Sequence, residues 1–198
     1  MAPTKLPTWA RRCSHMPAWA ERATCYADLM VRHAVPGDAR RVAEITVAGW
    51  MTAYVGIVAD DVRERQNVEQ HLTYWLTEEA QQPPMCTWVA EDRGCVVGYA
   101  HAGPFRPEPG EGSDAGELWG IYVDPDHWGH GHGRALMAVV IDHFTLCGDD
   151  AAYLWVMHDN ERARRFLERA GWEVDDGVTR VDPTQEVRYR YDPSRKRP

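Results

Sequence analysis

The stretch VDPDHWGHGHGRALM, residues 123–137, places three histidines and three glycines in the seven residues from His127 to Gly133. Glycine recurs at every second position, at Gly129, Gly131 and Gly133, which is more than a turn requires. Without side chains, an anion can approach several successive backbone N–H groups of such a loop. The helical pattern that follows adds unpaired N–H donors and the positive end of its dipole. The stretch therefore predicts a loop that binds phosphate.

Two other interpretations of this stretch remain open, namely a glycine-rich turn without a ligand and a metal site. The metal interpretation depends on His127, His130 and His132, but no acid or cysteine pattern beside them completes a ligand set. Histidines that alternate with glycines would also be loosely held. A dinucleotide fingerprint is excluded because Arg134 stands where its third glycine belongs, and no Gly-Lys-Ser/Thr follows as in a P-loop. We expect no metal here.

Composition excludes several classes of protein. The chain has 198 residues, which suffices for one domain with a full core, and its net charge of −8 disfavours binding to nucleic acid. No apolar run approaches 18 residues, so we expect no membrane span. The five cysteines are widely spaced and form no C-x-x-C pair, which favours reduced thiols and a cytoplasmic location.

The pattern along the chain divides it into three parts. Residues 1–28 are rich in Pro, Ala and Arg without a sustained period; they fit a disordered or peripheral extension, a short helix packed on the domain, or a targeting segment. Residues 29–192 form the predicted domain, and residues 193–198 form a basic tail.

Within the domain, apolar periodicity predicts alternating strands and helices. The expected strands are 29–35, 85–91, 95–102, 117–123, 151–157, 172–181 and 186–192, and the expected helices are 39–50, 68–76, a segment after the glycine loop, and 160–170. Strands that alternate with helices, with hairpins at intervals, indicate an α/β (α+β) domain whose mixed sheet has helices packed on it.

The glycine stretch resembles the acetyl-CoA loop of the GNAT N-acetyltransferase superfamily, Q/R-x-x-G-x-G/A after a strand that often ends in V-x-P. Gly131 and Gly133 fill the two small positions, whereas Trp128 replaces the Gln or Arg. A second segment, NERARRFLERAGW (160–172), is similar to the family signature N-x-x-A-x-x-F-Y-x-x-x-G-F. The residues that match are Asn160, Ala163, Phe166 and Gly171, and Trp172 replaces the usual Phe.

The resemblance implies a mixed, mostly antiparallel sheet with helices on both faces, splayed where the pantetheine of acetyl-CoA lies. It implies an N-acetyltransferase that moves acetyl to a primary amine by direct attack in a ternary complex, with a small-molecule amine preferred. A protein lysine, a protein N-terminus, or a non-catalytic acyl-CoA-binding regulator are the alternatives, and a homodimer is compatible with the sequence. The residues expected to bind the cofactor are Ile121, Tyr122, Val123, Gly129, His130, Gly131, His132, Gly133, Arg134, Asn160 and Phe166.

The chemistry requires a neutral amine, but a lysine-like amine has a pKa of about 10.4, so a general base is needed. By resemblance to the histone-acetylating branch, Glu117 is the candidate base, because a glutamate there lies on the same strand, eleven residues before the position of Trp128. The backbone N–H of Ile121, at an expected bulge, is the candidate oxyanion donor. The family's usual acid, a Tyr, is replaced by Leu167. Three explanations stay open: another group donates the proton, with Tyr122, Tyr153 and His158 as guesses, water donates it, or no acid is needed because a thiol pKa of about 8.5 makes the thiolate a tolerable leaving group.

We expect the acceptor to bind near the end of the first helix, where Trp50 and Tyr54 are four residues apart and could line one face. Both could equally be core aromatics. The loop 103–116 and the final hairpin are the other segments from which acceptor specificity is expected.

Overall fold

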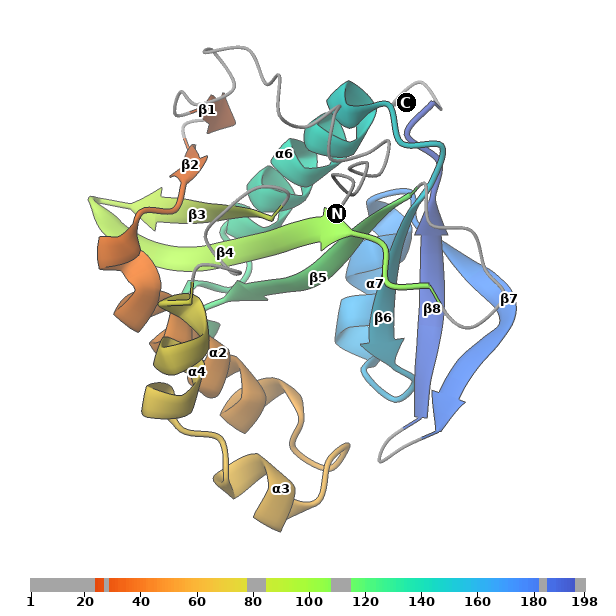
Figure 1. Ribbon diagram of the computed structural model, residues 1–198. Coiled ribbons are helices and arrows are strands. Elements are labelled where there is room, and N and C mark those ends of the chain that lie inside the picture. The colour runs from red at the N-terminus through yellow and green to blue at the C-terminus, as the bar shows by residue number, and fades with distance from the viewer. Residues whose placement is uncertain (1–23, 27–28, 78–84, 108–114, 182–184, 195–198) are drawn as a thin grey trace, which may run out of the picture.

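The computed structural model describes residues 24–26, 29–77, 85–107, 115–181 and 185–194 (Figure 1). The described strands are β1 (Thr24–Tyr26), β2 (Leu29–His33), β3 (Cys86–Asp92), β4 (Cys95–Pro104), β5 (Gly116–Val123), β6 (Ala152–Met157), β7 (Glu173–Val181) and β8 (Gln185–Tyr191). The described helices are α2 (Ala39–Ala53), α3 (Asp60–Glu64), α4 (Val68–Trp75), α6 (His132–Cys147) and α7 (Glu161–Arg169), with 3₁₀ turns η1 (Pro36–Asp38) and η2 (Pro125–His127).

The eight described strands form one sheet in the order β1-β2-β3-β4-β5-β6-β8-β7. Neighbours pair antiparallel, except that β5 and β6 pair in parallel. This order confirms the expected mixed, mostly antiparallel sheet with helices packed on it.

Helices cover both faces of the sheet (Figure 1). Adjacent residues of a strand point to opposite faces, so neighbouring positions on one strand show what covers each face. On β3, Val89 packs in one buried cluster with Ile45 of α2, while Ala90 packs in another with Leu136 of α6 and Leu167 of α7. The first cluster also contains residues of α4. The sheet is therefore the middle layer between α2 and α4 on one side and α6 and α7 on the other.

The sheet opens between its two parallel strands. β5 and β6 pair only at Gly116–Ala152 and Glu117–Tyr153. Beyond Glu117, β5 continues along β4 as far as Val123, and β6 continues along β8. The two strands therefore form a fork, which is the expected splay, and Figure 1 shows β5 and β6 diverging in this way.

A β-bulge on β5 changes which side chains share a face near the fork. The pairing shifts between His101–Gly120 and Ala102–Leu118, so that Trp119 is the additional residue. A bulge was expected on this strand at Ile121, and the structure has it two residues earlier. Because of this extra residue, Glu117 and Tyr122 both lie on the face covered by α2 rather than on opposite faces.

Two elements were not predicted. Thr24–Tyr26, within the segment expected to be an extension, pairs with β2 as an edge strand. Helix α3 has only five residues, and none of them is buried. Residues 1–23, for which an extension, a packed helix or a targeting segment was expected, lie outside the described residues, as do residues 195–198 of the expected tail. Within the described parts of the chain, no helix is long and apolar enough to cross a membrane.

Candidate functional site

The glycine loop connects β5 through η2 to the N-terminus of α6. Gly129 and Gly131 have φ values of 84° and 91°, in the left-handed region that favours glycine. Gly131 caps α6, and its carbonyl accepts the N–H of Ala135 at 3.0 Å. The N–H groups of the first helical turn have no partner within the helix. Since Gly129 and His130 are exposed, an anion can reach this end of α6 from solvent.

The second signature segment lies beside the glycine loop. A Cβ at Gly133 would be 3.5 Å from Cε2 of Phe166, which places the ring of Phe166 against the start of α6. Asn160 caps α7, where its side chain accepts the N–H of Ala163 at 3.1 Å, and it is buried. The two segments expected to form one cofactor site are thus adjacent in the fold. A capping role accounts for Asn160 without a ligand.

Trp128, which departs from the family pattern, links the loop to its surroundings. Its indole Nε1 donates to the carbonyl of Val123 at 2.7 Å, and the guanidinium of Arg162 on α7 lies 3.8 Å from the ring centroid. The Val123 carbonyl, expected to face the pantetheine, therefore already accepts one hydrogen bond. Sequence reasoning identified Trp128 as a departure but not as a bridge between β5 and α7.

Glu117 lies at the base of the fork and is almost completely buried, with 1% of its surface exposed. Its Oε2 accepts hydrogen bonds from the backbone N–H of Arg106 at 2.9 Å and from Nε of the Arg106 side chain at 3.2 Å. Its Oε1 accepts a hydrogen bond from Nη2 of Arg106 at 2.5 Å. The Arg106 side chain is 54% exposed, and its guanidinium stacks 4.1 Å from the ring centroid of Trp119. The candidate base is thus held as one half of an ion pair.

Ile121 and Tyr122 follow the bulge on β5. Ile121 pairs with Ala100 and packs against the core on the α6 side. Tyr122 pairs with Tyr99, and their rings stack at 5.5 Å with an interplanar angle of 16°. Burial raises the pKa of Tyr122, while hydrogen bonds from the side chains of Tyr54 and Trp50 oppose that rise.

Trp50 and Tyr54 form a wall of aromatic side chains at the end of α2 together with Tyr122. The rings of Trp50 and Tyr54 meet edge to face at 4.7 Å. The helix can approach β5 here because a Cβ at Gly49 would lie only 2.9 Å from Cδ1 of Tyr122. Burial is the main cause that raises the pKa of Tyr54 well above its ordinary value. The expected acceptor residues are therefore brought together with a residue expected to bind the cofactor.

Two charged residues of β8 were missed by sequence reasoning. In the antiparallel pairing of β8 with β6, Glu186 lies opposite Met157 and Arg188 lies opposite Trp155. Burial raises the pKa of Glu186, and the positive charges of Arg180 and Arg106 partly offset this. The negative charge of Glu186 in turn contributes to the raised pKa values of Tyr54 and Tyr122. Glu186 is thus close enough to the aromatic wall to act on it electrostatically.

Leu167, which stands where the family has its usual acid, is buried in the core. The residues considered as alternative acids have different surroundings. The ring of Tyr153 packs against Phe105 with centroids 4.5 Å apart. Nδ1 of His158 lies 2.7 Å from Oδ1 of Asp159. The ring of Tyr122 stacks on that of Tyr99 in the aromatic surroundings of α2.

The three histidines of the loop also differ. His130 is exposed, whereas His132 is buried, and burial lowers the pKa of His132. Nδ1 of His127 lies 3.6 Å from Oδ2 of Asp92. Of the three histidines on which the alternative metal interpretation depended, His127 and His132 lie with Asp92 of the β3–β4 hairpin, whereas His130 does not belong to that group.

Residues 55–172 match the family model described as the acetyltransferase (GNAT) family. The uncharacterized N-acetyltransferase YuaI of Bacillus subtilis is 32% identical over 131 residues, which are 66% of this chain and 72% of that protein. A mycothiol acetyltransferase of Propionibacterium freudenreichii is 34% identical over 50% of this chain but only 31% of its own length. An L-amino acid N-acyltransferase of Escherichia coli is 31% identical over 43% of this chain and 49% of its own length.

Solved structures share the fold. A Salmonella typhimurium protein described as an acetyltransferase, with its cofactor acetyl-CoA, superposes with a TM-score of 0.67 at 22% identity, over 85% of this chain and 95% of that one. The PaiA N-acetyltransferase of Thermoplasma acidophilum, in complex with coenzyme A, gives a TM-score of 0.65 at 16% identity, over 83% and 98% of the two chains.

Proposed function

Because the chain belongs to the acetyltransferase (GNAT) family, we propose that it transfers acetyl from acetyl-CoA to the primary amine of a small molecule, by direct attack in a ternary complex. The observation that carries this proposal is the fork between β5 and β6, which opens at Glu117 and is continuous through β5 with the glycine loop at the start of α6. The loop suits the pyrophosphate, and the fork suits the extended pantetheine arm.

The cofactor contacts proposed are the same residues that the sequence indicated. The backbone N–H groups of Gly129, His130, Gly131, His132, Gly133 and Arg134 would hold the pyrophosphate. Backbone groups of Ile121, Tyr122 and Val123 would line the pantetheine, with Phe166 packed beside the loop and Asn160 at the start of α7. The N–H of Ile121 is the proposed oxyanion donor.

We propose Glu117 as the general base, with Arg106 as the group that an amine displaces. Among the described residues, Oε1 of Glu117 accepts a hydrogen bond only from the Arg106 side chain, whereas Oε2 also accepts one from a backbone N–H. An ammonium group carries the same charge as the guanidinium, so a cationic acceptor can take its place on Oε1. Proton transfer to Glu117 then leaves the neutral amine, which attacks the thioester carbonyl to form a tetrahedral intermediate. The C–S bond of that intermediate breaks to give the amide and CoA thiolate, which can leave without a dedicated acid because a thiol has a pKa of about 8.5 and which is then protonated by water.

The acceptor would bind between the aromatic wall of Trp50, Tyr54 and Tyr122 and the carboxylate of Glu186. Aromatic faces attract cations as well as apolar groups, and a carboxylate adds charge attraction. This combination favours an amine that carries an apolar or aromatic group. Relatives named for mycothiol and for L-amino acids support small acceptors, although a protein amine remains the alternative.

Direct transfer is preferred to a route through an acyl-cysteine. Of the described cysteines, Cys147 contacts His143 at 3.6 Å, a pairing that could activate a thiol. However, Cys147 is buried and ends the 16-residue helix that begins at the glycine loop. With only 3% of its surface exposed, the Cys147 thiol is not accessible to the thioester of a bound cofactor.

The test is to incubate the protein with acetyl-CoA carrying a labelled acetyl group, first alone and then with small amines, peptides with lysine, and peptides with free N-termini. We expect no label on the protein, and label on one class of small amine by mass spectrometry. Label on the protein before the amine is added would contradict direct attack. Label on peptides alone would replace the small-molecule acceptor by a protein amine.

A further inference from the structure

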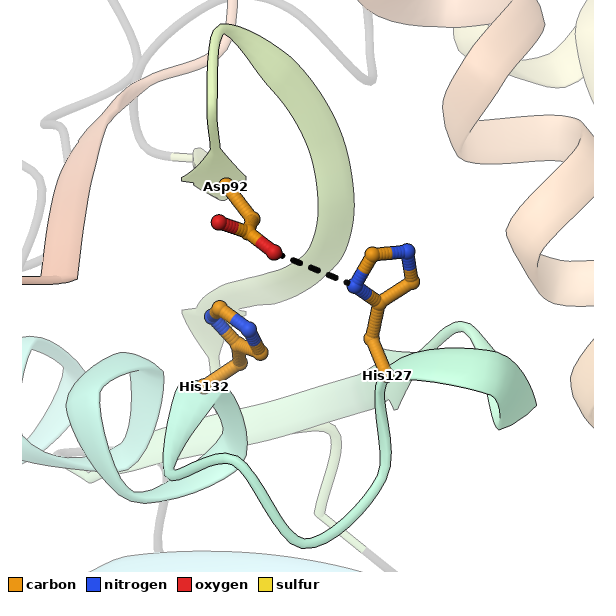
Figure 2. Close-up of side chains that lie close together, drawn as sticks. All are labelled: Asp92, His127 and His132. Carbon is orange, nitrogen blue, oxygen red and sulfur yellow. Dashed lines mark ion pairs between the residues drawn. The ribbon is translucent and has the colours of Figure 1, made fainter.

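Three side chains with metal-binding atoms meet on the side of the glycine loop that faces the β3–β4 hairpin. They are Asp92, the last residue of β3, His127, the last residue of η2, and His132, the first residue of α6. One ligand atom from each lies within 4.8 Å of the other two. Figure 2 shows the Asp92 carboxylate and the two imidazole rings turned toward a common space.

An ordinary ion pair accounts for the approach of Asp92 and His127 but not for the position of His132 beside them. Asp92 and His127 form a pair at 3.6 Å, and each is partly exposed, so solvent can satisfy their remaining atoms. His132 is only 2% exposed, and within the described part of the chain its buried Nδ1 has no hydrogen-bond partner. Buried polar atoms in folded proteins nearly always have partners. A buried imidazole with an unpartnered nitrogen, grouped with a carboxylate and a second imidazole, is suited to bind a cation.

The distances fit a small metal ion. Zinc binds histidine nitrogen and carboxylate oxygen at roughly 2.0–2.2 Å, so two ligand atoms of a tetrahedral site lie about 3.4 Å apart. The His127–Asp92 distance of 3.6 Å is already near that value. The upper limit of 4.8 Å for the trio requires only small side-chain rotations.

We propose that Asp92, His127 and His132 bind one divalent transition metal ion of the zinc class. Two imidazoles and one carboxylate suit zinc, cobalt or nickel, whereas magnesium and calcium prefer sites made of oxygen ligands. Three protein ligands leave a fourth position for water or for His130, which is exposed, with its ring centroid 6.5 Å from that of His132. The proposal differs from the sequence expectation of no metal, because Asp92, 35 residues before His127, completes the set.

The ion would act as a structural clip. His127 and His132 lie on either side of Gly129 and Gly131, the two loop residues with positive φ. Asp92 belongs to the β3–β4 hairpin, so that a bound ion would join both ends of the loop to the hairpin. The loop would then be held by coordination in addition to its glycine geometry.

The experiment uses the 198-residue chain without an affinity tag, treated with chelator and then freed of it. Cobalt(II) is titrated and followed by its visible absorption, zinc is then added as a competitor, and bound metal is measured by elemental analysis. We expect one ion per chain, loss of the cobalt spectrum on zinc addition, and a rise in melting temperature with metal, because an ion that binds only the folded state stabilises it.

Two variants with changes at partly exposed ligands test the assignment without altering the core. Asp92→Asn and His127→Gln should each weaken metal binding by at least about tenfold and remove the metal-dependent rise in melting temperature. His158→Gln is the matched control, because His158 also contacts an aspartate, Asp159 at 2.7 Å, but belongs to no three-residue cluster among the described residues. Circular dichroism checks the fold of each variant.

Each outcome either supports the metal site or overturns it. Loss of binding in Asp92→Asn and His127→Gln, with wild-type binding in His158→Gln, supports the site. Binding that is equal in all four proteins places the metal elsewhere and overturns the proposal. The absence of saturable cobalt or zinc binding by the wild-type protein overturns it as well.

Discussion

Glu117 of β5 and Tyr153 of β6 form the last parallel pair before the two strands separate. The buried carboxylate of Glu117 therefore lies at the point where the sheet stops being continuous. Its ion pair with Arg106 closes the same point from the side of the β4–β5 connection. The carboxylate of Glu117, the displaceable guanidinium of Arg106 and the opening of the sheet thus lie at one place in the fold.

Replacement of Glu117 tests the proposed base. Glu117→Gln keeps the shape of the side chain but cannot accept a proton, so we expect kcat to fall by about 10²- to 10⁴-fold. The affinity for acetyl-CoA, measured by calorimetry, should stay within about twofold of the wild-type value, because the proposed cofactor contacts are unchanged. Turnover equal to the wild type at saturating amine would reject Glu117 as the base.

Glu186→Gln provides the comparison for that variant. Glu186 is proposed to attract the acceptor rather than to take its proton, so we expect a raised KM for a cationic amine and a kcat close to the wild-type value. The effect should shrink as salt is raised, because screening weakens charge attraction. A large loss of kcat in Glu186→Gln, together with a mild effect of Glu117→Gln, would exchange the two roles.

A pair of glycine substitutions tests the phosphate loop. Gly129 and Gly94 have similar positive φ values, 84° and 80°, and a Cβ at either would meet no atom within 4 Å. Alanine should thus cost a similar backbone strain, about 1 kcal/mol, at both positions. We expect only Gly129→Ala to weaken acetyl-CoA binding markedly by calorimetry. Equal affinities in the two variants would remove Gly129 from the cofactor site.

His101 predicts an acid-sensitive stability. Burial and the nearby charge of Arg106 lower its pKa from 6.5 to about 4, and its ring nitrogens lie 2.8 Å from Thr87 Oγ1 and 3.2 Å from the Tyr74 hydroxyl. The folded protein therefore holds this imidazole neutral where the unfolded chain protonates it. The stability is complete above pH 6.5 and is lost as the pH falls from 6.5 towards 4.

Urea unfolding at pH 7 and pH 5 measures this loss. For the pKa shift of His101 alone, the free energy of unfolding should fall by about 2 kcal/mol between the two pH values. His101→Gln carries no such group, so the difference between the two pH values should be smaller by that amount in the variant. An identical pH dependence in the two proteins would show that His101 is not held neutral by the fold.

Most of the fold could be predicted because burial leaves a periodic trace in the sequence. β3 and β4 appear as continuous apolar runs because both of their faces are buried, and the helical spacing in α2 and α6 comes from burial of one helix face. Helix α3 leaves no such trace, since it buries none of its residues. The bulge at Trp119 could not be located either, because it depends on the pairing of β5 with β4 rather than on a local signal.

The sequence predicted the parts of the candidate site that depend on backbone conformation. It predicted less well which side chains meet once the strands have paired. The positive φ values of Gly129 and Gly131 follow from residue type. The partner of Glu117 does not, because Arg106 reaches it across the β4–β5 connection. Asp92 and Glu186 were missed for the same reason. Each approaches the loop or the aromatic wall only after the strands have taken their register.

The most direct test of the proposed acetyl transfer is a calorimetric titration of the purified protein with acetyl-CoA, followed on the same sample by a thiol-release assay with a panel of amines. We expect saturable binding of one acetyl-CoA per chain and CoA release that depends on one class of small amine. Binding without amine-dependent release would favour a non-catalytic acyl-CoA-binding regulator. No binding at all would contradict the assignment of the glycine loop to the cofactor.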